Sequence, residues 1–490
     1  MNTKALRQKV LDLAIHGKLV PQNPNDESAT VLLEKIRAEK AEKIKKGELK
    51  ADKKDSFIFV GSDKRHYEQF ADGTVKDIED EIPFEVPDGW AWCRLGELFY
   101  HTTGKALKKS NNKGSLRKYI TTSNLYWNKF DFTEVREMYF TDDELDKCTI
   151  KKGDLVLCNG GDVGRAAIWN YNEDICYQNH VSRLRPKIEG INNSLYLYLL
   201  MFYKEQGMLN GKGVGITSLS ANDLLSAIFP LPPLNEQNSI VTSIENIFEQ
   251  IEHLDQEKSD LQTIIKQTKS KILDLAIHGK LVPQDPNDEP AEELLKRIVT
   301  SDNRPYKKID EDEALFDIPE SWSWCTLGEI YTHTTGKALK KTNNKGTLRK
   351  YITTSNLYWN SFDFTEVREM YFTDDELEKC TIKKGDLILC NGGDVGRAAI
   401  WNYDYDICYQ NHVSRLRPKN KNINNSFFLY VIMIYKQQGI LNGKGVGIIS
   451  LSASDLLSAV VPLPPYSEQN RIVEKIECLY GNLTIINNQL

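Results

Sequence analysis

The chain has 490 residues, of which 40% are hydrophobic and 27% charged, so it is long enough for more than one globular domain with its own core. Its net charge of −6 does not exclude a polyanionic partner, because binding depends on where charges cluster and not on their sum. The N-terminus has no apolar signal region, and the longest apolar run, Leu195–Tyr203, is too short to span a bilayer. We therefore expect a cytoplasmic protein.

The N-terminal residues belong to a helical segment that is repeated later. The sequence KVLDLAIHGKLVPQ at 9–22 returns as KILDLAIHGKLVPQ at 271–284, 262 positions further on. A shorter helix is predicted from about Ser28 to Lys46 and its counterpart from about Pro290 to Ile298. Residues 43–55 are rich in lysine and poor in apolar side chains, which predicts a solvated linker that we extend over 47–82.

A globular segment is also repeated in the sequence. Trp90–Gln237 returns almost letter for letter as Trp322–Gln469, always 232 positions later. In the first copy we expect strands at Lys118–Ser123, Gly153–Cys158 and His180–Arg185, and helices at Ser220–Ser226 and after Thr141, where three acids form a typical first turn. The predicted fold class is α+β, with two near-identical α/β domains.

A long amphipathic helix is predicted between the copies, from Glu236 to His278, with Asn235 as N-cap and Gly279 as the terminating residue. From Ile240, nine of eleven positions at alternating four- and three-residue spacing are apolar, as in a coiled coil. Such a helix is about 65 Å long, close to two turns of B-DNA at about 34 Å each.

The chain ends predict a second helix of the same kind, in two pieces. Residues after Glu468 keep the apolar seam, and the two repeat offsets place the N-terminal helix as their continuation. We therefore expect the termini to meet. We also expect the composite helix to pack antiparallel to the central one, relating the domains by a pseudo-two-fold axis.

Residues for catalysis or metal binding are not apparent. His101–Lys105 lacks the upstream glycine and downstream hydroxyl of a phosphate-binding loop, and Gly211–Gly215 is not framed by a strand and an acid. Eight of the nine cysteines are repeat equivalents without zinc-module spacing, which predicts reduced core thiols. We expect no catalytic residue and no metal site in this chain.

Residue types that suit contacts with nucleic acid occur in both copies instead. A basic stretch without acids at 101–119 precedes a hydroxyl and amide cluster, and further polar residues lie in two glycine-rich loops and a Gln-Asn-His triple. Lysine and arginine suit phosphates, whereas Asn, Gln, Ser and Thr suit base edges. The candidate DNA-binding residues are Lys105, Lys108, Lys109, Arg117, Lys118, Thr121, Thr122, Ser123, Asn124, Arg165, Gln178, Asn179, His180 and Lys212, with their copies Lys337, Lys340, Lys341, Arg349, Lys350, Thr353, Thr354, Ser355, Asn356, Arg397, Gln410, Asn411, His412 and Lys444.

Each of these elements also has a purely structural interpretation. The glycine loops could serve only as tight turns, and the Gln178 and Asn179 amides could be satisfied inside the core. Trp127 is of a residue type that is more often core than contact, and the basic stretch alone could be a solvated face.

Specific motifs now point to a family. They are Leu11–Gln22, the DPNDE sequence at 285–289, the PLPP…EQ helix starts at 230–237 and 462–469, and the cyclic layout of two domains. In these the chain resembles, over essentially its whole length, the specificity subunits of type I restriction-modification enzymes.

The resemblance implies target recognition domains at 83–234 and 317–466, each reading one half of a bipartite DNA target. It implies helical regions at 1–46, 235–300 and 467–490 that set the half-site separation and dock two methyltransferase subunits, with linkers at 47–82 and 301–316. Two restriction subunits would complete the enzyme. S-adenosylmethionine, ATP and Mg²⁺ would belong to these partners.

The near-identity of the two copies departs from the family pattern of dissimilar recognition domains. With a pseudo-two-fold axis between them, we expect half-sites that are inverted copies. Two other functions stay open on the sequence alone: a self-contained, type II-like restriction or modification enzyme, and a coiled-coil scaffold that binds only protein.

Overall fold

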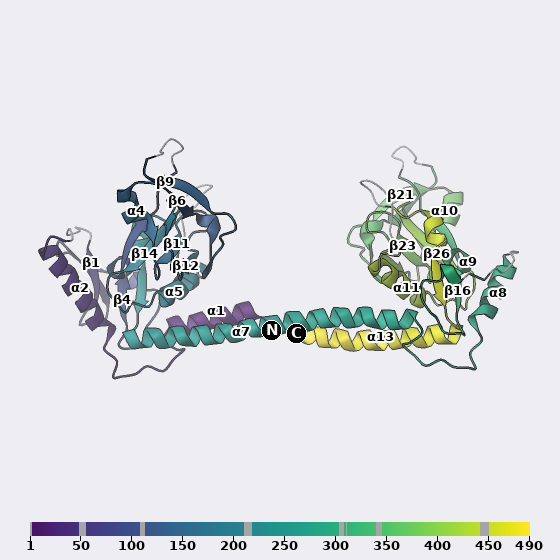
Figure 1. Cartoon of the computed structure of the whole chain (residues 1–490), viewed down its shortest axis with the longest axis horizontal. Coiled ribbons are helices and arrows are strands. Elements are labelled where there is room, and N and C mark those ends of the chain that lie inside the picture. The colour runs from purple at the N-terminus through teal and green to yellow at the C-terminus, as the bar shows by residue number, and fades with distance from the viewer. Residues whose placement is uncertain are drawn as a thin grey trace. The chain divides into compact units, whose positions relative to one another are not determined.

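The structure is a computed structural model that describes residues 2–48, 55–107, 113–209, 218–302, 308–309, 311–339, 345–441 and 450–490. It divides into two compact units, Met1–Gln256 (unit 1) and Glu257–Leu490 (unit 2), with the boundary inside one long helix. Each unit mixes helices and sheets (Figure 1), so the predicted α+β class is confirmed. Within the described ranges, no helix has the length and apolar character needed to cross a membrane.

Unit 1 is built around one long helix, six shorter ones and fifteen strands in the part that the structure describes. Its helices are α1 (Thr3–Ile15), α2 (Ala29–Lys45), α3 (Leu95–Leu98), α4 (Asp142–Cys148), α5 (Asn193–Glu205), α6 (Ala221–Leu225) and the first part of α7 (Leu234–Ile277). Its strands are β1 (Ser56–Val60), β2 (His66–Phe70), β3 (Val75–Asp77), β4 (Ala91–Arg94), β5 (Phe99–Thr103), β6 (Ser115–Ile120), β7 (Leu125–Tyr126), β8 (Lys129–Phe130), β9 (Arg136–Phe140), β10 (Thr149–Ile150), β11 (Leu155–Cys158), β12 (Ala166–Ile168), β13 (Ile175–Tyr177), β14 (Val181–Pro186) and β15 (Ile228–Leu231).

Unit 2 repeats this plan from β4 onward. Its helices are the rest of α7, α8 (Ala291–Ser301), α9 (Leu327–Ile330), α10 (Asp374–Cys380), α11 (Asn425–Gln437), α12 (Ala453–Leu457) and α13 (Tyr466–Gln489). Its strands are β16 (Ser323–Thr326), β17 (Tyr331–Thr335), β18 (Thr347–Ile352), β19 (Leu357–Tyr358), β20 (Ser361–Phe362), β21 (Arg368–Phe372), β22 (Thr381–Ile382), β23 (Leu387–Cys390), β24 (Ala398–Ile400), β25 (Ile407–Tyr409), β26 (Val413–Pro418) and β27 (Val460–Leu463).

The core of each unit lies on both faces of an antiparallel sheet, ordered β12-β11-β14-β5 in unit 1. Successive strand residues point to opposite faces. Leu155 and Leu157 of β11 therefore join the core beneath helices α1 and α5, while Val156 and Cys158 pack towards a second, mixed sheet, β10-β13-β6-β9. The eight repeat-equivalent cysteines are all buried and free, which confirms the prediction of core thiols.

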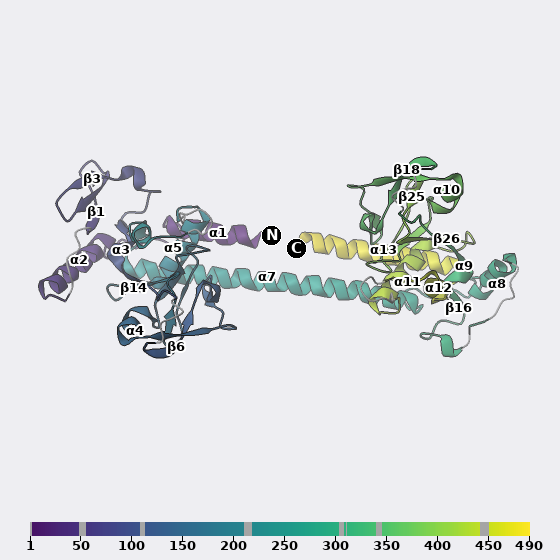
Figure 2. The same ribbon diagram turned by 90° about the horizontal axis from the view of Figure 1, so that it is seen from above.

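The long helix agrees with the predicted coiled coil in most respects. In unit 1, α1 lies along α7 (Figures 1 and 2), with Arg7 over the Phe248 ring at 5.3 Å and 3.8 Å from Asp255. In unit 2, α13 lies along α7, and the Tyr480 hydroxyl donates to the Lys269 carbonyl at 3.0 Å. The helix ends as predicted, because Gly279 adopts φ +67° and the next N–H donates to Leu275 O.

Two details of this helix were predicted wrongly. The Gln237 N–H already donates to the Pro233 carbonyl at 3.0 Å, so α7 begins at Leu234 and Asn235 lies in its first turn instead of capping it. The seam residue Leu254 is 44% exposed, since little of α1 lies beyond its Arg7–Asp255 contact. The expected meeting of the termini and the pseudo-two-fold axis stay predictions.

The KVLDLAIHGKLVPQ motif and its copy 262 positions later contact the PLPP…EQ motifs in the folded chain. Glu236 accepts hydrogen bonds from the Gln22 side-chain amide at 3.1 Å and from the Trp90 indole at 2.9 Å. In unit 2, Glu468 accepts the same two bonds, from Gln284 and Trp322. In each unit one buried carboxylate thus joins the helix start, the GKLVPQ segment and the tryptophan that precedes β4 or β16. Burial raises the pKa of Glu468.

The predicted linker at 47–82 is wrong from residue 56 onward. Residues 56–77 form an antiparallel three-stranded sheet, β1-β2-β3, whose Ile58 packs with Trp92 and Ile228. Arg94 anchors the sheet through a bond to Glu68 of β2 at 2.6 Å, and it also bonds Glu81, which follows β3, at 2.8 Å. Unit 2 has Thr326 in place of Arg94. The lysine-rich residues before this sheet led to the linker assignment, but its strands obtain their apolar partners from the globular core.

Candidate nucleic-acid interface

Five segments of unit 1 are hydrogen-bonded to one another, and we refer to them as the loop cluster: 104–105, 120–122, 158–165, 178–180 and 218–219. Backbone hydrogen bonds of 2.8–3.0 Å join them, namely Lys105 N to Tyr177 O, Asn179 N to Lys105 O, Gln178 N to Ile120 O, Asn159 N to His180 O and Leu219 N to Asn159 O. The same bonds recur 232 positions later in unit 2, which contains an equivalent loop cluster. Segments far apart in the sequence are therefore held side by side.

A glycine makes this convergence possible. A Cβ atom on Gly104 would lie 2.2 Å from the Tyr177 carbonyl oxygen, closer than real Cβ atoms approach backbone, and Gly336 meets Tyr409 in the same way. The chain after β5 can therefore pass directly beside the Gln178–His180 turn.

The Gln178–His180 turn offers unused polar side chains. Gln178 and Asn179 are half-buried and His180 is exposed. Within the described ranges, none of the three side chains forms a hydrogen bond, so the alternative of satisfied buried amides is not met there. Gln410, Asn411 and His412 behave alike in unit 2. Amides held at a surface without protein partners can bond a base edge.

A buried polar relay supports this turn from below. The Asn159 side-chain amide donates to Ser182 Oγ at 2.8 Å and to the Asn179 carbonyl at 3.2 Å. His101 Nε2 lies 2.9 Å from the same Ser182 Oγ. Burial, with a contribution from Arg183, lowers the pKa of His101. A neutral imidazole can accept the serine hydrogen, so the relay is complete only when His101 is unprotonated.

The Thr121–Asn124 cluster divides into structural and available residues. Asn124 is 4% exposed; its Oδ1 accepts from the Thr121 N–H at 2.9 Å and its amide donates to the carbonyls of Asp131 and Glu134. Thr121 and Asn124 therefore hold the turn, and Thr353 and Asn356 do so in unit 2. Ser123 is exposed, with its hydroxyl 2.7 Å from Thr121 Oγ1, and Thr122 is half-buried; Ser355 and Thr354 are alike in unit 2.

The predicted cationic side chains also divide into internally bonded and exposed ones. The Lys105 ammonium, 8% exposed, donates to Glu144 at 2.6 Å and to the Tyr139 carbonyl at 2.7 Å, and Lys337 does the same in unit 2. Arg165 donates to the Thr122 carbonyl at 2.7 Å and pairs with Asp162, as Arg397 pairs with Asp394. These side chains already have internal partners.

Exposed cations lie on one strand of the mixed sheet. Arg117 and Lys118 on β6, and Arg349 and Lys350 on β18, are exposed to solvent. In unit 2 the last two line a hollow together with Glu369 and Asp406, whose carboxylates weaken the local positive potential. Six further predicted cations lie outside the described residues: Lys108, Lys109, Lys212, Lys340, Lys341 and Lys444.

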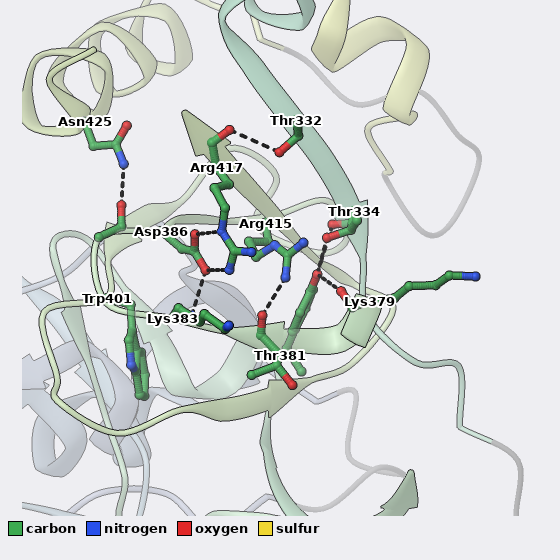
Figure 3. A network of polar contacts seen from close by, with 12 residues as sticks. Thr332, Thr334, Lys379, Thr381, Lys383, Asp386, Trp401, Arg415, Arg417 and Asn425 are labelled. Carbon is green, nitrogen blue, oxygen red and sulfur yellow. Dashed lines mark hydrogen bonds and ion pairs between the residues drawn. The ribbon is translucent and has the colours of Figure 1, made fainter. Parts of the chain in front are cut away.

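A polar network that was not predicted from the sequence fixes the β17-β26-β23-β24 sheet of unit 2 (Figure 3). Asp386, 2% exposed, accepts two hydrogen bonds of 2.7 Å from Arg417, and Arg415 donates to the Thr381 carbonyl at 2.5 Å. The equivalent pair in unit 1 is Arg185 with Asp154. Two arginines in a strand-like run, at 415 and 417, were a usable signal, since buried charges need partners.

Comparisons with known proteins agree on one family. The sequence model for "Type I restriction modification DNA specificity domain" matches residues 87–263 and 319–490. The type I restriction enzyme EcoAI specificity subunit of Escherichia coli is 27% identical, over 97% of this chain and 88% of its own length. The EcoEI specificity subunit of Escherichia coli is 28% identical, over 67% of this chain and 61% of its own length.

Two solved structures share the fold. The HsdS subunit from Thermoanaerobacter tengcongensis has a TM-score of 0.52 at 17% identity, with 84% of this chain and 93% of that chain covered. A chain from a structure that describes complex assembly and conformational transition of the type I R-M system has a TM-score of 0.54 at 17% identity, covering 83% of this chain and 94% of its own.

Proposed function

Because this chain belongs to the family of type I restriction-modification DNA specificity subunits, we propose that each unit reads one half of a bipartite DNA target through its loop cluster. The side chains of the Gln178–His180 turn carry this proposal, because they form no hydrogen bond with any residue that the structure describes, whereas the groups around them are bonded to one another. Gln and Asn amides suit adenine edges in the major groove, and the exposed Arg117 and Lys118 suit the neighbouring phosphates.

The two halves of the target are the same sequence in opposite directions. All five segments of the loop cluster have identical residues in both units, so both units offer the same base contacts. The inverted orientation rests on the pseudo-two-fold axis expected from the cyclic repeat. The target is therefore a palindrome interrupted by an unread spacer.

Sequencing of methylated bases in the host genome tests this proposal. We expect an interrupted palindromic motif whose methylation disappears when the gene for this chain is deleted. An asymmetric bipartite motif would contradict identical reading, and methylation that persists in the deletion strain would contradict the specificity role. Nuclease or methyltransferase activity of the purified chain alone would instead favour a self-contained enzyme.

We further propose that the helical regions hold two methyltransferase subunits and set the spacer length, and that two restriction subunits complete the enzyme. S-adenosylmethionine, ATP and Mg²⁺ are then bound by those partners and not by this chain. Support comes from family membership and from the length of α7, at 44 residues about 66 Å. Changing the spacer of the target by two or more base pairs should abolish specific binding by the assembled complex; unchanged binding would contradict this role of the helices.

A further inference from the structure

A short hairpin extends the loop cluster on one side. Strands β7 and β8 pair Tyr126 with Lys129 across a two-residue turn, in which Asn128 adopts φ +54°. The Asn128 N–H donates to the Ala166 carbonyl at 3.0 Å, directly after the 158–165 segment. The hairpin is thereby fixed to the loop cluster by its own backbone.

Two cations lie over the Tyr126 ring of this hairpin in unit 1. The Tyr126 ring, 41% exposed, lies under the Arg165 guanidinium at 5.3 Å and the Lys129 ammonium at 5.9 Å. Arg165 has internal partners, but Lys129 is exposed and forms no ion pair within the described ranges. Hydrogen bonds from the hydroxyl and the backbone N–H of Thr133 lower the pKa of the nearby Asp131 carboxylate, and the charge of Lys129 contributes to this lowering. The exposed Lys129 ammonium has no hydrogen-bond or ion-pair partner within the described ranges, so it can bind a further anion.

Unit 2 has the same hairpin without this charge. Tyr358 and Arg397 keep the 5.3 Å contact, but Ser361 occupies the place of Lys129, and its hydroxyl donates to the Trp359 carbonyl at 3.3 Å. The loop clusters beside the two hairpins are identical in sequence. The two reading surfaces thus differ in formal charge at their edge but not in the residues that face the bases.

We propose that Lys129 binds a DNA phosphate beside the half-site read by unit 1, and that unit 2 lacks this contact because of Ser361. This inference rests on the proposed function. It makes the two units unequal in affinity for identical half-sites, through the phosphate backbone and without a difference in sequence preference. Each phosphate neutralised by a lysine adds about −0.9 to the slope of log K against log salt.

Three variants of the assembled complex test this inference: Lys129→Ser, Ser361→Lys and the double exchange. We expect Lys129→Ser to make the salt slope shallower by about 0.9. On a fourfold rise in salt, the affinity of this variant should then fall by a factor about 3.5-fold smaller than that of the parent. Ser361→Lys should steepen the slope by the same amount, and the double exchange should restore the original value. Affinities for specific and non-specific duplexes should change by the same factor.

The outcomes separate the inference from the function. Slopes that are the same for all three variants and the parent would overturn the Lys129 contact, provided that the parent complex still prefers its target. A change confined to the specific duplex would also overturn it, because phosphate contacts do not read sequence. A parent complex without preference for the methylated motif would refute the proposed function itself. Equal thermal midpoints of all variants serve as the control for folding.

Discussion

Lys105 offers the sharpest test of the distinction between structural and DNA-binding cations. The Lys105→Met variant removes an ammonium that is 8% exposed and donates to Glu144 and to the Tyr139 carbonyl. Hydrogen bonds to charged groups contribute about 1.5–3 kcal/mol each. Glu144 is 32% exposed and can be rehydrated, so we expect a net loss of about 1–2 kcal/mol. The thermal midpoint should fall by about 2–8 °C.

The loss should also depend on pH with a defined sign. The Lys105 hydrogen bond, followed by one from the Thr141 N–H, holds the pKa of Glu144 below its usual value. A depressed carboxyl pKa stabilises the fold above the unfolded pKa, and this contribution is lost as pH falls through the folded pKa. Lys105→Met should therefore show a smaller loss of stability on acidification than the parent chain.

Thermal denaturation and DNA binding at several salt concentrations measure the two roles separately. Lys118→Met is the matched control, since Lys118 is exposed on β6 and was predicted from the same basic stretch. We expect Lys105→Met to lower the midpoint and leave the salt slope unchanged. Lys118→Met should do the reverse, with a slope shallower by about 0.9. A shallower slope with an unchanged midpoint for Lys105→Met would refute the structural assignment of this lysine.

Two further predictions concern the Gln178–His180 turn and its support. Changing both Gln178 and Gln410 to Ala should weaken binding to the specific target by about 1–3 kcal/mol per half-site and should weaken non-specific binding far less. A competition assay measures both affinities, and equal losses would mean that the glutamines have a structural role. The His101 pKa is lowered by burial, so the unfolded chain takes up the proton first, and stability should fall as pH drops below about 6.5. The double variant His101→Gln, His333→Gln should flatten this pH dependence, because an amide oxygen can accept the Ser182 hydrogen at any pH. Denaturant titrations at several pH values measure this, and the same pH dependence as in the parent would contradict the relay.

Local sequence patterns were sufficient to predict an element wherever the segment itself contains the signal for it. The apolar spacing of α7, the glycine at 279 and the acids after Thr141 each predict an element that the structure contains. The three-stranded sheet at 56–77 was missed, because its strands are stabilised by contacts with Trp92 and Ile228, far along the chain. Short strands of this kind depend on packing more than on intrinsic propensity.

The sequence by itself determined that one domain is written twice, that long helices flank both copies, and that the chain resembles type I specificity subunits. These are properties of repetition and periodicity, which depend on neighbours along the chain. Only the tertiary structure decided which polar residues are available. Lys105 and Lys118 lie in one basic stretch, yet one ammonium is bonded to Glu144 and the other is exposed. Whether a charge is free depends on partners that folding brings from elsewhere, and a linear motif does not contain them.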